Sequence, residues 1–219
     1  MRVLALDSAL ARCTAAIVVN GDVHAARQID AVQGHAAILP VMARDVLAET
    51  ATAVPSLELV AVTVGPGSFS GIRSGLAMAH GLALAAGVPV VGVTVGEALA
   101  DSLPHLGERG LWVAIDSRRG RVFLERDGHI SAELLDTLPA PSGKIALAGD
   151  AAAPVAARLA ARDFDVMLTD ARLPLARHIA VVAMRRFAGD LRPMLAQPLY
   201  IDPPEAKLPT GGLRPPPSG

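Results

Sequence analysis

The spacing of apolar residues divides the first half of the chain into short strands and helices. Apolar, β-rich runs occupy residues 3–6, 14–19 and 23–29, and the Asn20-Gly21 pair predicts a hairpin between the second and third runs. The continuous apolar run at 59–64 is typical of a buried parallel strand. The other elements expected in this half are a helix at 35–50, a helix that ends near 86, a strand at 88–93 and a helix at 97–103.

The helix expected at 35–50 has one apolar face. Leu39, Met42 and Val46 recur on that face at helical spacing, whereas the charged residues of the segment lie elsewhere. Pro40 lacks an N–H group and is therefore compatible with this helix only in the first turn. We expect His35 at the start of the helix.

The same order of elements begins again in the second half. Segment 5–8 matches 114–117 at an offset of 109 residues, and the turn at 20–21 matches 127–128 at an offset of 107. Two separate features at nearly one offset indicate a duplication. The elements expected in this half are strands at 111–117, 121–126, 129–134, 145–149 and 166–169 and a helix at 174–188. Two copies of a three-strand meander followed by αβ units are typical of the actin-like (ASKHA) α/β fold.

This pattern predicts two αβ lobes, of which the second is reduced. We place the first lobe at 1–104 and the second at 105–202. The remaining segment, 203–219, is rich in proline and glycine and has almost nothing to bury. It is expected to be a mobile tail, or to become ordered only on a partner.

Composition and charge restrict the classes of function. Apolar residues make up 52% of the 219 residues but aromatic residues only 3%, so the core must consist of small aliphatic side chains. The 20 Lys and Arg residues against 21 Asp and Glu residues give a net charge of -1, which provides no broad positive surface for nucleic acid. Any contact with RNA is therefore expected to be local or made through a partner.

The cysteine and histidine content argues against disulfides and metal sites. Cys13 is the single cysteine, so we expect a small strand residue rather than a reactive thiol, in a reducing, cytoplasmic setting. The six histidines include no pair at helical ligand spacing, so no metal site is expected. Residues 74–96 carry no formal charge, but Pro89 and five glycines divide them into a helix and a strand, and no membrane span is expected.

The most distinctive motif follows the strand at 59–64. The spacing of its glycines and serines excludes a Walker phosphate loop, a dinucleotide fingerprint and a nucleophile elbow. A strand-to-helix turn remains, in which one of the two serines caps the next helix. The residues of this loop are Gly65, Pro66, Gly67, Ser68, Phe69, Ser70 and Gly71.

Arg73 lies in the first turn of the helix that follows, where the helix dipole disfavours a cation by up to about 1 kcal/mol. Two explanations remain open: the guanidinium pairs with a carboxylate, or it reaches an anion or a partner.

Small residues recur at four-residue spacing along the same helix. A face this flat packs either against its own sheet or against another subunit. In the second case Leu76, Met78 and Leu82 would face a partner helix. The residues of this candidate partner interface are Leu39, Met42, Val46, Gly71, Arg73, Gly75, Leu76, Met78, Ala79, Leu82 and Ala83.

Asp7 and Asp116 each end a strand, the position at which actin-like ATPases hold the aspartates that position metal-bound nucleotide. Neither is followed by the glycine of a phosphate hairpin, so turn formation and a place near a nucleotide both remain open. Arg118, Arg119 and Arg121 form the densest basic cluster, which is either a solvated turn or a contact for RNA or an acidic partner.

These motifs together closely resemble the bacterial TsaB (YeaZ) family, over nearly the whole chain to about residue 202. The resemblance rests on segments 4–8, 35–40, 65–73, 115–118 and 197–200. It implies a cytoplasmic subunit of the machinery that attaches a threonylcarbamoyl group to the adenosine beside the tRNA anticodon. The most specific part of the resemblance is the glycine-serine loop.

The resemblance also implies where the chemistry lies. In this family it belongs to the paralogous subunit TsaD, which holds a metal with two histidines four residues apart. Val95 and Leu99 stand at the matching positions, so the resemblance implies no catalytic residue and no metal site in this chain. It further implies a four-helix interface, formed with TsaD or as a homodimer, by the helix after the loop and the helix at 35–50.

Two hypotheses for the function follow. The first is a non-catalytic subunit that stabilises a TsaD-type paralogue, with a TsaE-type ATPase as a further partner, tRNA bound only through the complex and a homodimer when alone. It has no cofactor of its own, and ATP or ADP lies at the complex interface. The alternative is an autonomous actin-like kinase of a small molecule, using Asp7 and Asp116, but neither hairpin has the glycines that such an enzyme needs.

Overall fold

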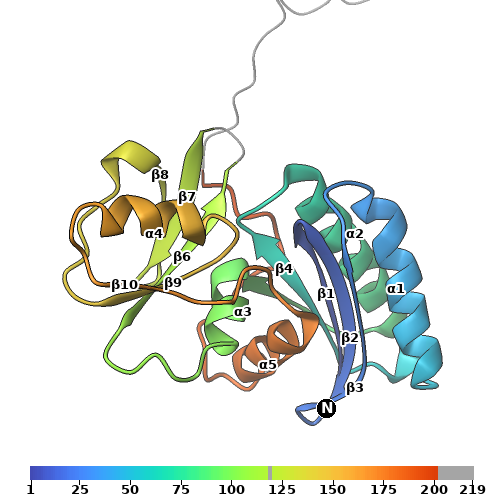
Figure 1. Cartoon of the computed structure of the whole chain (residues 1–219). Coiled ribbons are helices and arrows are strands. Elements are labelled where there is room, and N and C mark those ends of the chain that lie inside the picture. The colour runs from blue at the N-terminus through green and yellow to red at the C-terminus, as the bar shows by residue number, and fades with distance from the viewer. Residues whose placement is uncertain (118–119, 202–219) are drawn as a thin grey trace, which may run out of the picture.

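The computed structural model describes residues 1–117 and 120–201 and contains two five-stranded sheets of the same topology (Figure 1). In each sheet a three-strand antiparallel meander is followed by two parallel strands, in the orders β3-β2-β1-β4-β5 and β8-β7-β6-β9-β10. The duplicated actin-like α/β fold expected from the sequence is confirmed. The strands are β1 (Arg2–Leu10), β2 (Arg12–Val19), β3 (Asp22–Asp30), β4 (Leu59–Gly65), β5 (Val90–Thr94), β6 (Gly110–Asp116), β7 (Arg121–Arg126), β8 (His129–Leu134), β9 (Ile145–Ala148) and β10 (Val166–Leu168).

The first sheet is covered on both faces, which explains the continuous apolar runs of its central strands. Leu4 and Leu6 of β1 face α1 and α2, whereas Val3 and Ala5 face the opposite side and pack against α5. Cys13 lies in strand β2, as expected, and its side chain is buried. The helices are α1 (His35–Glu49), α2 (Phe69–Ala86), α3 (Val95–Asp101), α4 (Ala152–Ala160) and α5 (Ala176–Phe187), with short 3₁₀ turns at Val54–Ser56 and Leu135–Thr137.

The second sheet has α4 on one face and the first lobe on the other. Trp112 and Leu124 pack against α4, while Ile115 belongs to the core of the first lobe. Between β8 and β9 only the short turn stands where the first lobe has α1 between β3 and β4. The second lobe is thus reduced, as its sparser pattern predicts.

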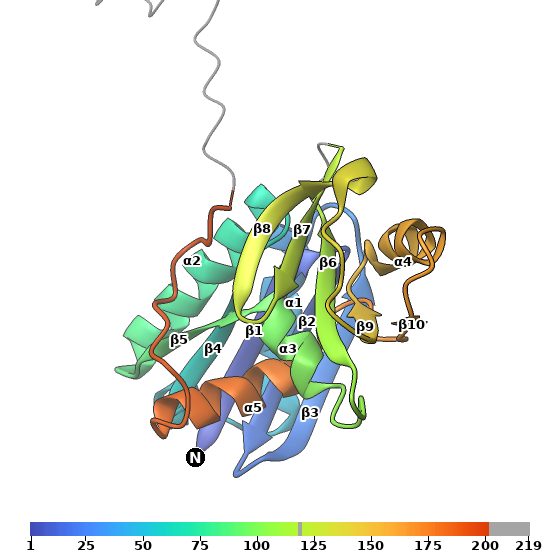
Figure 2. The ribbon, with the colours of Figure 1, turned by 90° about the vertical axis from the view of Figure 1, so that its left-hand side faces the viewer.

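The chain returns to the first lobe at its end. Helix α5, which we assigned to the second lobe, packs against β1, β2 and β5 of the first sheet. Residues after α5 run along β5 and α2 (Figure 2), where Leu199 N–H donates to Val64 O at 2.9 Å. The division at residue 105 therefore does not separate the two lobes, because the segment from 176 onward completes the first one. The tail at 203–219 lies outside the described residues.

Two helices differ from the expectation, one in its interior and one in its boundary. Pro40 is the sixth residue of α1 and lies beyond its first turn, so the helix continues through a position without an N–H donor. Helix α3 begins two residues before the expected position because Thr94 caps it: the Thr94 hydroxyl accepts from Glu97 N–H at 3.0 Å and the Glu97 carboxylate accepts from Thr94 N–H. Among the described residues, none of the helices combines the length and apolar character needed to cross a bilayer.

Candidate functional site

The glycine-serine loop is locked onto the end of β1. Ser68 N–H donates to Ala9 O at 2.7 Å, and the Ser8 hydroxyl donates to Gly71 O at 2.9 Å. A Cβ on Gly71 would lie 2.0 Å from Ser8 O, so only glycine permits this approach. The glycines of the loop therefore allow its backbone to pack closely against strand β1. Ser68 also caps α2 by accepting from Gly71 N–H at 3.3 Å, which confirms the cap expected at Ser68 or Ser70.

Asp7, which precedes Ser8 in β1, is fully buried. Its Oδ1 accepts from Ala9 N–H at 2.9 Å and from the Thr63 hydroxyl, and its Oδ2 has no hydrogen-bond partner among the described residues. Burial raises the pKa of Asp7 to about 6, against the lowering effect of the Thr63 and Ala9 hydrogen bonds. The carboxylate links β1 to β4 inside the core, and a place of Asp7 beside a nucleotide stays a prediction.

Asp116, the equivalent residue of the second lobe, has a different environment. It is exposed at the end of β6, and its N–H donates to Asp150 Oδ1 at 2.9 Å. The two aspartates therefore do not form a symmetric pair. Arg121 begins β7 beside this turn, and its proposed partners Arg118 and Arg119 lie outside the described residues.

Arg73 stacks on an aromatic ring. Its guanidinium carbon lies 3.6 Å from the centroid of the Phe69 ring, and its Nη2 donates to the Tyr200 hydroxyl at 2.8 Å. Among the described residues its partners are these two aromatic side chains, a contact that neither of our two explanations names, and both explanations stay open. The sequence pattern missed this contact because Tyr200 lies 127 residues away.

A pocket of about 340 Å³ opens beside the loop, and we call it the loop pocket. It lies where the glycine-serine loop, the end of β6 and the C-terminal segment meet. The C-terminal segment is held there by Leu199 and by His80, whose Nε2 lies 2.8 Å from Ala196 O. The pocket is lined by Pro66, Gly67, Ser68, Phe69, Ser70, Ile72, Asp116, Ser117, Phe123, Pro198, Leu199, Tyr200 and Ile201.

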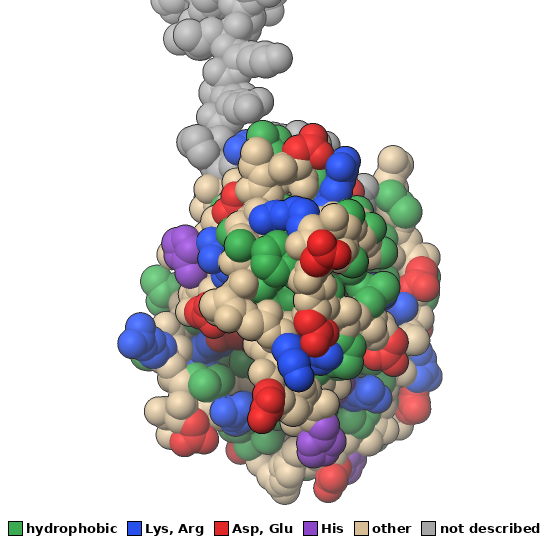
Figure 3. Space-filling view, turned by 60° about the vertical axis from the view of Figure 1, so that its left-hand side comes forward, with side chains coloured by type: hydrophobic (Ala, Val, Ile, Leu, Met, Phe, Trp, Pro, Cys, Tyr) green, Lys and Arg blue, Asp and Glu red, His purple; other side chains and the backbone are tan. Residues whose placement is uncertain are grey.

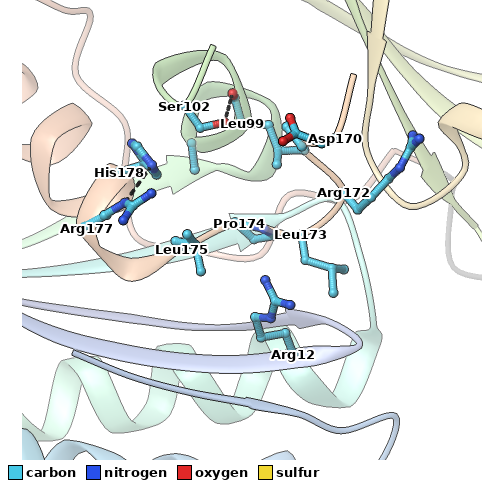
Figure 4. A pocket seen from close by; sticks show the side chains of 12 residues that line it. Arg12, Leu99, Ser102, Asp170, Arg172, Leu173, Pro174, Leu175, Arg177 and His178 are labelled. Carbon is cyan, nitrogen blue, oxygen red and sulfur yellow. Dashed lines mark hydrogen bonds between the residues drawn. The ribbon is translucent and has the colours of Figure 1, made fainter. Parts of the chain in front are cut away.

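A second pocket, of about 360 Å³, lies under the segment that returns from β10 to α5 (Figure 4). It brings Ser102 and His178 to one cavity, with Asp101 2.8 Å from His178 Nδ1. The three do not form a nucleophile and base, because the Ser102 hydroxyl donates to Leu99 O at 2.6 Å and Arg177 Nε donates to His178 Nε2 at 3.0 Å.

The small-residue stripe of α2 packs inside the chain. Gly71, Gly75, Ala79 and Ala83 are buried against the first sheet, and a Cβ on Gly75 would lie 3.0 Å from Ser8 Oγ. This corrects the interface prediction for these residues, because a helix whose stripe lies on its own sheet cannot present it to a partner. Further members of the predicted interface are buried for the same reason: Leu39, Met42, Val46 and Leu76.

What α1 and α2 do expose is an apolar groove between them, of about 490 Å³, which we call the helix groove. Met78 and Leu82 of α2 form one wall, and Pro40 and Leu47 of α1 lie on the other. Met78 and Leu82 are thus the residues of the predicted interface that a partner could reach in this groove. Arg44 is the charged residue of its lining.

A buried carboxyl group links the two lobes, and the sequence pattern carried no signal for it. Glu125 of β7 contacts Gly96 of α3 so closely that a Cβ on Gly96 would overlap the carboxylate. Its neighbour Glu97 is paired with Arg186 of α5, whose Nη1 also donates to Gly92 O at 2.6 Å. Burial, and then the charge of Glu97, raise the pKa of Glu125 to about 7.

The positions that the resemblance aligns with metal ligands are apolar and enclosed. Val95 and Leu99 are at most 1% exposed in the core of the first lobe. In the described part of the chain, no three His, Cys, Asp or Glu side chains come together as a metal site would require.

On the face shown in Figure 3, Lys and Arg side chains alternate with Asp and Glu side chains.

Comparison with known proteins gives one family and consistent relatives. Residues 28–163 match the family model described as "TsaD: tRNA N6-adenosine threonylcarbamoyltransferase". The chain is 36% identical over 124 residues to the tRNA threonylcarbamoyladenosine biosynthesis protein TsaB of Escherichia coli (strain K12). The matched segment covers 56% of the chain and 53% of that protein. It is 40% identical over 75 residues to the tRNA N6-adenosine threonylcarbamoyltransferase of Ruegeria pomeroyi, covering 33% of the chain and 20% of that enzyme.

The fold has solved counterparts. The structure of YeaZ from Pseudomonas aeruginosa superposes with a TM-score of 0.73 at 24% identity, over 91% of this chain and 100% of that chain. This likeness shows the fold. The chain spans about half the length of the first curated relatives that it matches.

Proposed function

We propose that this chain, which belongs to the TsaD family and within it to the TsaB (YeaZ) group, is a non-catalytic subunit for the synthesis of threonylcarbamoyladenosine in tRNA. The observation that carries the proposal is its identity of 36% over 124 residues to a protein named for this biosynthesis. In this role the chain binds and stabilises a TsaD-type catalytic paralogue.

The enclosed residues Val95 and Leu99 support a non-catalytic role. A metal held by two histidines needs imidazole nitrogens that face an open position, and two buried aliphatic side chains supply neither. The alternative, an autonomous kinase, is not favoured, because Asp7 is buried and engaged by Thr63 and Ala9 rather than placed toward a nucleotide.

The helix groove is the surface that we propose for the partner. Its lining is mainly apolar, and burial of apolar area is the main source of affinity between helices of two subunits. Val41 of α1 and Leu84 of α2 are 46% and 86% exposed and extend the apolar surface of the same two helices. The same surface would close a homodimer when the paralogue is absent.

The remaining partners follow from the family resemblance. A TsaE-type ATPase would join the complex, ATP or ADP would lie at the interface between subunits, and tRNA would be bound through the complex. The near-balanced charge of the chain supports this indirect contact with RNA, because it lacks the excess of Lys and Arg that a phosphate backbone requires.

The test is threonylcarbamoyl transfer to tRNA by purified TsaD-type and TsaE-type proteins of the same organism, with and without this chain. We expect transfer to require the chain and the double variant Met78→Lys, Leu82→Lys to lose both complex formation and transfer, since two charges would be buried in an apolar interface. The matched control is Leu168→Lys, which charges a leucine that is 45% exposed in the second sheet. Transfer that is unchanged without the chain, or ATP turnover by the chain alone, would show that the proposal is wrong.

A further inference from the structure

We propose that Glu125 controls the closure of the two lobes by its protonation: the neutral carboxyl group holds β7 against α3, and loss of the proton lets the lobes separate. The meeting of Glu125 with Gly96 joins β7 of the second lobe to α3 of the first, and we call it the lobe contact. The proposal concerns this chain alone and does not rest on the proposed partner.

Glu125 occupies an apolar row of the second sheet. Alternate residues of a strand point to the same face, so Glu125 shares its face with Phe123, which packs against the core of the first lobe. Val113 of β6 lies opposite Glu125 and is 3% exposed in the same core. On its other side Glu125 pairs with Ile130 of β8. The carboxyl group therefore stands among apolar side chains where the lobes meet.

The lobe contact leaves one oxygen of the carboxyl group without a partner. Oε2 of Glu125 is buried and has no hydrogen bond among the described residues. A Cβ on Gly96 would overlap the carboxylate, so the backbone of α3 lies directly against it. A buried carboxylate without hydrogen bonds is costly, whereas the protonated form carries no charge. Closed lobes therefore favour the protonated form.

The cations beside the lobe contact have other partners. Glu97 faces Glu125 from α3, and Arg186 of α5 is paired with Glu97. Arg126, the next residue along β7, lies over the ring of Trp112 at 5.7 Å. Burial, and then the negative charge of Glu97, raise the pKa of Glu125 to about 7. The surroundings of the carboxyl group thus oppose its ionisation while the lobes are closed.

The direction and the size of the effect follow from the two states. In separated lobes the carboxyl group returns to water and to its ordinary pKa of 4.5, whereas in closed lobes it keeps its proton up to about pH 7. Closure is therefore favoured at low pH and loses this advantage as the pH rises from 4.5 to about 7. Between pH 5 and 8 the ratio of open to closed chains should rise on the order of 100-fold, since each unit of pKa difference corresponds to a factor of ten.

The experiment measures opening by the reaction of a cysteine placed between the lobes. Val113→Cys puts a thiol where dithiodipyridine, which reacts with thiols at acidic as well as neutral pH, reaches it only when the lobes separate. Peptide mass spectrometry reads this site separately from Cys13. The rate is compared from pH 5 to pH 8 with that of the same cysteine in a Glu125→Gln chain, so the pH dependence of the thiol itself cancels. We expect the rate with Glu125, divided by the rate with Glu125→Gln, to rise on the order of 100-fold over this range.

Two controls separate opening of the lobes from other causes. Leu159→Cys reports complete unfolding, because Leu159 is fully buried in the core that α4 forms with the second sheet. Val113→Cys should react faster than Leu159→Cys at pH 8. Glu108→Gln, which neutralises an exposed carboxylate, should leave the rates unchanged.

Two results would overturn the proposal. Equal rates for Val113→Cys and Leu159→Cys would show that the lobes separate only when the chain unfolds. A ratio of rates that stays constant between pH 5 and 8 would show that Glu125 does not control the contact. Neither result affects the transfer assay, so this proposal and the proposed function fail separately.

Discussion

Glu125→Gln should change how the stability of the chain depends on pH. Glu125 is enclosed between the lobes beside Glu97, and these surroundings raise its pKa from the ordinary 4.5 to about 7. Below pH 4.5 the carboxyl group is protonated in both the folded and the unfolded chain and has no effect on the pH dependence. Between 4.5 and about 7 the unfolded chain releases this proton while the folded chain retains it, so the free energy of unfolding falls as the pH rises.

The size of the effect follows from the same two values. Raising a pKa from 4.5 to about 7 corresponds to roughly 3 kcal/mol, since a tenfold change in a proton equilibrium is about 1.4 kcal/mol. A neutral glutamine keeps the shape of the side chain and removes the charge. The difference in unfolding free energy between Glu125→Gln and the unmodified chain should therefore grow in favour of the variant by up to about 3 kcal/mol between pH 4.5 and 8.

Urea unfolding at a series of pH values measures this difference. Asp7, whose pKa is raised to about 6, also lowers stability as the pH rises, but it is present in both proteins and cancels. Glu108→Gln, which neutralises an exposed carboxylate, is the control and should follow the unmodified chain. Two parallel curves for Glu125→Gln and the unmodified chain would refute the reasoning about the contact between lobes.

Two further predictions concern the packing of the first lobe. Gly75→Leu should lower the free energy of unfolding by about 1–3 kcal/mol, because the new side chain would meet Ser8, Val62 and Leu39. Gly81→Ala should raise the free energy of unfolding by about 0.5–1 kcal/mol, because this helical position is exposed and nothing lies near its Cβ. Thermal unfolding distinguishes them, and a stable Gly75→Leu protein would contradict the packing described for the stripe. Cys13, whose pKa is raised to about 11 by burial and then by the charge of Asp7, should react with iodoacetamide far more slowly in the folded chain at pH 8 than in urea. Equal rates in the two states would show that the thiol is accessible.

Local patterns were sufficient to predict the strands and their order, and the helices other than α4, which those patterns did not predict. Alternating and continuous apolar runs predicted the strands, and two features at nearly one offset predicted the duplication, because each strand depends mainly on its own residues and on whether its faces are buried. A cap at Ser68 or Ser70 could also be predicted from the sequence, because a helix cap involves residues only three positions apart.

Contacts between distant segments were decided only by the tertiary structure. The stripe of small residues on α2 is compatible with a sheet or with a second subunit, and only the position of Ser8 and Val62 beneath Gly75 shows that it lies on the sheet. In the same way, Tyr200 meets Arg73 and Glu125 meets Gly96 because the chain crosses between lobes and returns. Periodicity within one element describes which face is apolar, but what covers that face depends on the path of the rest of the chain.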